Sequence, residues 1–253
     1  MEQLAASFWN IRGAFKVAGL IDLGTHMSLV RRQDGRFLVI DSCAPSEPDR
    51  NALRALTADG EAIDAIINVH PFHTLYCRAM HEFAPRARLF GTRRHRQKSP
   101  DLPWMDQPIE EPAAQALFAN DLEFSVPAGL DFVCPNEHVH VASVLVRHRA
   151  NGVVHVDDTL NVLAAPGRLG RLLPQSRLRF HPLLAKALQR RPGAAQEFEG
   201  WARELAERWK ETRILCAAHS AVRRLPAGGW REEVLAALAA VETRLAAHRA
   251  RYG

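Results

Sequence analysis

The sequence lacks any apolar run close to the roughly 20 residues that a membrane-spanning helix needs, so no membrane span is predicted. Its four cysteines stand singly, without a Cys-x-x-Cys pair, which is typical of reduced thiols rather than of a disulfide framework. The first residues lack a basic segment followed by an apolar core, so no signal peptide is predicted. Together these absences favour a cytoplasmic protein.

Several functional motifs are also missing. The sequence contains no glycine-rich phosphate loop, no Gly-x-Ser-x-Gly elbow and no dinucleotide-binding fingerprint. With 47% hydrophobic and 24% charged residues, the composition excludes collagen-like, low-complexity and disordered proteins. The 253 residues are enough for one large domain, and we predict a single domain over residues 1–253.

Two hairpins and a series of alternating elements are predicted from the local pattern. Strands over 26–31 and 36–41 flank Asp34-Gly35, and strands over 141–148 and 153–157 flank Asn151-Gly152; both dipeptides favour tight turns. Further elements are expected in the order helix 48–56, strand 63–69, helix 74–83, strand 88–91, helix 196–210, strand 213–218 and helix 230–249. This alternation indicates a layered α/β (α+β) fold.

The sequence contains 12 histidines, and about half of them lie at the ends of predicted strands. Ligands bind outside strand ends in such folds, and imidazole with carboxylate suits zinc, iron or manganese. The candidate metal ligands at these ends are His70, His73, His138, His140, Asp158 and His219.

Each candidate also has a simpler interpretation. A single histidine at a strand end is more often packed or exposed than a ligand, and Asp157-Asp158-Thr159 is the kind of sequence that forms a turn or caps a helix. His155 alternates with Asp157 along one strand and is expected to be a packed or solvated residue. No site is predicted for His81, His95, His148, His181 and His248.

Five stretches resemble the metallo-β-lactamase superfamily in sequence and order. They are HMSLVRRQDGRFLVIDSCAP, INVHPFHTLY, EHVHVASVLVRH, VVHVDDTL and ILCAAHS, spread over about residues 20 to 220. The resemblance implies an αββα sandwich with a metal site at the edge between its two sheets. It also implies that Asp158 takes the place of the family's metal-bridging aspartate, which makes it the candidate catalytic residue, and that His219 takes the place of the last ligand.

The most specific motif of this family, His-x-His-x-Asp-His, is incomplete in the sequence. His70 and His73 are three residues apart, and either could be the ligand; the positions of the Asp-His pair fall on Thr74 and Leu75 or on Leu75 and Tyr76. The choice between His138 and His140 is equally open. The resemblance therefore implies one ion rather than two, either zinc or, as alternatives, iron or manganese, and the loss of the metal is a further alternative.

These observations predict a metal-dependent hydrolase with an atypical, mononuclear site. Its substrate would be a small ester, thioester, lactone or amide, and Asp41 or Asp157 would orient a ligating histidine. The alternative is a non-catalytic protein that kept the fold and acts in binding.

A basic cluster over residues 86–98 adds a possible preference for anions. It contains Arg86, Arg88, Arg93, Arg94, His95, Arg96 and Lys98. The cluster fits an anionic group on a small-molecule substrate, whereas nucleic acid is the less favoured partner because only Phe90 could stack on bases. The sequence gives no indication of the oligomeric state.

Overall fold

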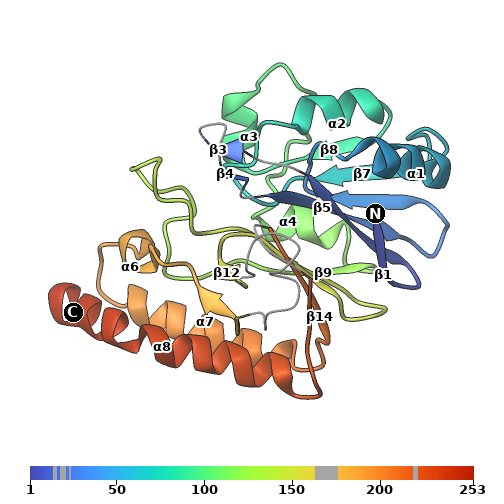
Figure 1. Ribbon diagram of the computed structural model, residues 1–253. Helices are drawn as coiled ribbons and strands as arrows, with labels where there is room; N and C mark the ends of the chain where they lie inside the picture. Colours follow the sequence, from blue (N-terminus) through green and yellow to red (C-terminus); the bar gives the residue numbers. More distant parts are fainter. Residues whose placement is uncertain (14–15, 18–20, 23, 163–175, 219–221) are drawn as a thin grey trace. The chain divides into compact units, whose positions relative to one another are not determined.

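The computed structural model describes residues 1–13, 16–17, 21–22, 24–162, 176–218 and 222–253. The chain forms two compact units, the first made of residues 1–124 with 146–155 and the second of residues 125–145 with 156–253. Helices and strands alternate in the first unit, and the two longest helices belong to the second (Figure 1).

A six-stranded sheet is the centre of the first unit. Its strands, in spatial order, are β1 (Glu2–Ala5), β2 (Phe8–Gly13), β5 (Thr25–Arg31), β6 (Phe37–Ile40), β7 (Ile63–Ile67) and β8 (Arg88–Phe90). The first four strands are antiparallel to one another, and β6, β7 and β8 are parallel. The β5–β6 hairpin confirms the prediction from Asp34-Gly35, and Gly35 has the positive φ of 84° that such a turn requires.

Two helices connect the parallel strands, as a parallel pair requires. Helix α1 (Glu47–Thr57) begins at Ser46, whose hydroxyl accepts the backbone N–H of Asp49, and α2 (Cys77–Phe83) follows β7. Both helices pack on one face of the sheet. The apolar core there combines Leu53, Cys77 and Met80 of the helices with alternate residues of the strands: Trp9, Ile11, Met27, Leu29, Phe37, Val39, Ile66 and Leu89. Because side chains alternate along a strand, His26 and Ser28 lie on the opposite face of the sheet from Met27 and Leu29.

The rest of the first unit is made of short elements. They are β3 (Lys16–Val17), β4 (Ile21–Asp22), α3 (Arg93–Lys98), α4 (Pro112–Ala116), β9 (Leu122–Ser125), β10 (Leu145–His148) and β11 (Val154–Val156). Strands β10 and β11 form the second predicted hairpin, with Val146 opposite His155 and a positive φ of 69° at Gly152.

The second unit is built on two long helices. Helices α7 (Ala194–Arg208) and α8 (Gly229–Tyr252) lie side by side (Figure 1), and the indole N–H of Trp230 donates to the carbonyl of Leu205 at 3.2 Å. The shorter elements are β12 (Leu160–Asn161), β13 (Arg179–Phe180), α6 (Leu184–Ala187), β14 (Ile214–Ala217) and β15 (Val222–Arg224). Within the described residues, no helix has the length and apolar character to cross a bilayer.

The predicted boundaries near His70 shift in the structure. Strand β7 ends at Ile67 instead of 69, and α2 begins at Cys77 instead of 74, so residues 68–76 form a loop. The backbone N–H of His73 donates to the carbonyl of His70 at 3.0 Å, which closes a turn around Pro71. The loop continues through residues 74–76, where the apolar spacing predicted the first turn of the helix.

Candidate functional site

Asp41 joins the ends of two neighbouring parallel strands. It directly follows β6, is fully buried and has a φ of 61°, which is unusual for a residue other than glycine. Its backbone N–H donates to the carbonyl of Ile67 at 2.9 Å, and its Oδ1 accepts the N–H of Val69 at 2.7 Å. The end of β6 and the residues after β7 are thereby held together, with the second carboxylate oxygen directed at histidines.

His73 is the first histidine beside this carboxylate. Its Nδ1 lies 3.4 Å from Oδ2 of Asp41, and its ring stacks on that of His70 with the centroids 4.0 Å apart. The backbone N–H of Phe72 donates to Nδ1 of His70 at 3.2 Å. Because Nδ1 of His70 accepts this hydrogen bond, the proton of the neutral His70 ring lies on Nε2. In His73 the Asp41 carboxylate lies beside Nδ1, so Nε2 is the nitrogen that is available to a metal ion.

The buried His95 supports the loop that carries these rings. Its Nδ1 accepts the backbone N–H of Thr92 at 3.1 Å, and its Nε2 lies 3.4 Å from the carbonyl of His73. Burial lowers the pKa of His95 to about 4, so the ring is neutral at pH 7. Because Nδ1 accepts a hydrogen bond from the backbone N–H of Thr92, the ring proton lies on Nε2, and Nε2 donates to the carbonyl of His73.

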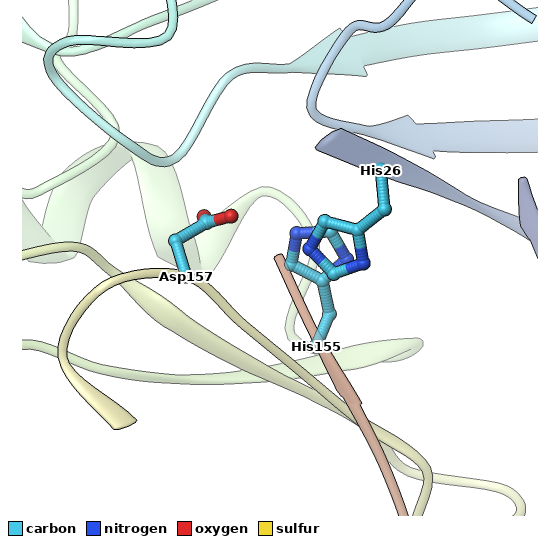
Figure 2. A group of neighbouring side chains, drawn as sticks. All are labelled: His26, His155 and Asp157. Carbon is cyan, nitrogen blue, oxygen red and sulfur yellow. The ribbon is translucent and has the colours of Figure 1, made fainter. Parts of the chain in front are cut away.

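A second pair of histidines lies on the other side of Asp41. Nε2 of His155 is 3.7 Å from Oδ2 of Asp41, and Nδ1 of His155 is 2.9 Å from the hydroxyl of Ser28. The ring of His26 stacks on His155 with the centroids 4.0 Å apart and an interplanar angle of 11°. Figure 2 shows the two rings face to face and labels Asp157, which follows His155 by two residues in the chain.

Asn10 completes this polar layer of the sheet. Its amide nitrogen lies 3.2 Å from Nδ1 of His26 and donates to the hydroxyl of Ser28 at 3.1 Å. Asn10 is opposite Ser28 in the β2–β5 register, so the side chains of Asn10, His26 and Ser28 occupy one face of the sheet. The layer connects Asn10 through His155 and Asp41 to His73.

Two of the predicted site residues are neighbours within one unit. His70 and His73 are neighbours in the first unit, where ligand nitrogens of the two rings lie within 4.8 Å of each other. The other described candidates belong to the second unit: Asp158 is buried after β11, whereas His138 is exposed and His140 half-buried in a loop. His219 lies outside the described residues.

The sequence analysis did not single out His26, and it gave His155 only as a packed or solvated residue. A signal for both was present, because His26 and Ser28 interrupt the otherwise apolar strand β5 at alternate positions. The same alternation places both polar side chains on one face. The sequence did not indicate that β11, which carries His155, faces His26 and Ser28.

The donor atoms around Asp41 fit a divalent metal ion in their chemistry. Imidazole nitrogen and carboxylate oxygen are the ligands that zinc prefers. A histidine that ligates zinc also usually has its other nitrogen hydrogen-bonded to a carboxylate or carbonyl, as His73 has to Asp41. His73 is therefore the residue of the first unit best placed to hold an ion.

The arginines of the basic cluster are paired with acidic side chains. Arg88 donates to Asp64 at 2.7 Å, and Arg86 and Arg93 contact Glu61 and Glu111. The guanidinium of Arg94 instead lies over the ring of Phe72, 4.3 Å from its centroid. Much of the positive charge of this segment is thus balanced within the protein.

Comparison with known proteins identifies the fold of this chain. No family model and no curated protein matches the sequence. Among solved structures, the chain is similar to a metallo-β-lactamase from Erythrobacter litoralis, with 16% identity, 96% of this chain and 95% of that chain covered and a TM-score of 0.59.

Two further metallo-β-lactamases give the same result. One, from Hirschia baltica, has 14% identity, 95% of each chain covered and a TM-score of 0.56. The other is FIM-1 from Pseudomonas aeruginosa in its mono-zinc form, with 11% identity, 96% of this chain and 94% of that chain covered and a TM-score of 0.59. The fold predicted from the five sequence stretches is confirmed: this chain has the metallo-β-lactamase fold.

Proposed function

We propose that this protein is a metal-dependent hydrolase with a single ion, in which His73 supplies one ligand. The observation that carries the proposal is the contact between Asp41 and His73 at 3.4 Å, at the ends of β6 and β7 in a metallo-β-lactamase fold. We further propose Asp158, His219 and one of His138 and His140 as the remaining ligands, as the sequence resemblance implies.

The residues of this chain have separate tasks in the proposed site. Asp41 holds the His73 ring with Nε2 available, and His95 fixes the backbone carbonyl of His73. A zinc ion held by these residues would supply the Lewis acidity that hydrolysis of an ester, thioester, lactone or amide requires. With His73 as the ligand, the Asp-His positions of the motif fall on Leu75 and Tyr76, which supply neither a carboxylate nor an imidazole, and the Leu75 side chain is 67% exposed; this favours one ion over two.

The proposal is tested by metal analysis of protein purified without a histidine tag. We expect about one equivalent of zinc, iron or manganese per chain, and loss of the metal in His73→Ala. His70→Ala keeps the metal if His73 is the ligand, and His81→Ala, a change on α2, is the matched control. Hydrolysis is measured with p-nitrophenyl acetate, a thioester and a lactone.

The alternative is a binding protein that kept the fold. The missing Asp-His pair after His73 favours it. Metal-free protein that stays folded, takes up no added zinc and hydrolyses none of these substrates would overturn the enzyme proposal and leave this alternative. A metal that remains in His73→Ala would instead refute the assignment of the ligand alone.

A further inference from the structure

The first unit contains a cavity on the helical side of its sheet. It has a volume of about 410 Å³ and lies between α1 and α2, with Cys43 among the residues that line it. Volumes of roughly 300 to 1,000 Å³ are usual for small-molecule sites in proteins. The cavity is formed entirely by residues of the first unit, away from the stacked histidines.

Two helical faces give this cavity an apolar interior. Leu53 of α1 and Met80 of α2 are buried core residues, and Phe83 lies one turn after Met80. Ala79 also lines the cavity, where its small and exposed side chain leaves space. An apolar chain of a ligand would find hydrocarbon contacts on both walls.

Arginines of α1 form the rim. Arg50 and Arg54 are exposed and lie one turn apart, on the same side of the helix as Leu53. Arg54 is 3.8 Å from Asp59. In contrast, no carboxylate among the described residues lies within 4.0 Å of the Arg50 guanidinium.

The other ionisable groups of the cavity include Glu82 and Cys43. Glu82 forms no ion pair with Arg50 within 4.0 Å. Burial raises the pKa of Cys43 to about 12, so this thiol is neutral at pH 7 and is not a nucleophile. The cavity therefore has the features of a binding site rather than of a reaction centre.

We propose that this cavity binds a small amphipathic carboxylate, with its apolar chain between Leu53, Met80 and Phe83. Its carboxylate pairs with the Arg50 guanidinium, which is suited to bidentate contact with a carboxylate. The site is independent of the proposed metal centre and stands even if the protein is not a hydrolase.

The test is calorimetric titration of the protein with decanoate and, separately, with decanol, which has the same chain length but no charge. We expect decanoate to bind at one site about tenfold more tightly than decanol, because decanol lacks the charged contact. Arg50→Gln lowers the affinity for decanoate by about the same factor and leaves that for decanol unchanged. Ala79→Phe fills the cavity and abolishes the binding of both.

Arg31→Gln is the matched control, since Arg31 is also exposed, has no carboxylate of the described part of the chain within 4.0 Å and lies outside this cavity. It should bind decanoate as the unchanged protein does. Circular dichroism checks that the three variants, all at exposed positions, keep their fold. The proposal is overturned if decanol binds as tightly as decanoate, if Arg50→Gln has no more effect than Arg31→Gln, or if Ala79→Phe still binds.

Discussion

His26 and His155 stack face to face in the interior, 129 residues apart in the sequence, with ring centroids 4.0 Å apart and both side chains fully buried. The pair connects β5 to β11 within the first unit and places His155 at 3.7 Å from Asp41. The hydroxyl of Ser28, 2.9 Å from Nδ1 of His155, fixes the orientation of that ring beside the Asp41 carboxylate. The pair therefore acts as a structural support for Asp41.

The first prediction concerns the coupling of these two rings. We expect His26→Leu and His155→Leu each to lower the free energy of unfolding by about 1 to 3 kcal/mol, since each change leaves buried polar partners unsatisfied. The double variant should lose less than the sum of the two, by about 0.5 to 1.5 kcal/mol. Urea unfolding of the three variants measures this coupling, with His81→Leu as the control, and strictly additive losses would show that the two rings act independently.

The second prediction separates the charge of Asp41 from its shape. Asn has the same size, tolerates a positive φ and can still accept the N–H of Val69, so Asp41→Asn should fold. It loses the negative charge beside Nδ1 of His73, and we expect the affinity for zinc to fall by about 10- to 100-fold. Competition with a chelator measures this affinity. An unchanged affinity would mean that Asp41 does not act on a metal ligand.

The third prediction is a pH dependence that arises from His148. Burial lowers the pKa of His148, while a hydrogen bond to Asn151 and the charge of Asp121 raise it and the charge of Arg147 lowers it further. The unfolded chain takes up a proton near pH 6.5 and the folded chain only at lower pH, so stability is lost as the pH falls below about 6.5. His148→Gln removes this contribution.

The measurement is the free energy of unfolding between pH 7.5 and pH 5 for both proteins. We expect the difference between the unchanged protein and His148→Gln to shrink as the pH falls, because only the unchanged protein must exclude a proton from this site. A difference that stays constant over the range would contradict the lowered pKa of His148.

Local sequence patterns determined much of the fold. Asp34-Gly35 and Asn151-Gly152 set two hairpins because both turns need a glycine with positive φ, and both occur in the structure. The apolar spacing located α1, α7 and α8 to within a few residues, since that spacing reflects the face each helix buries. The order of the five stretches was enough to predict the metallo-β-lactamase fold.

The candidate site depended on contacts that no local pattern contains. The sequence placed His70 and His73 after a strand, but the turn around Pro71, closed by the bond from His73 to His70, decided which ring lies beside Asp41. The partners of His155, His26 and Ser28, are more than 120 residues away in the sequence, so the local pattern predicts no more than a packed or solvated side chain at this position. Periodicity reports which face of a strand a side chain occupies, and only tertiary structure decides what lies opposite that face.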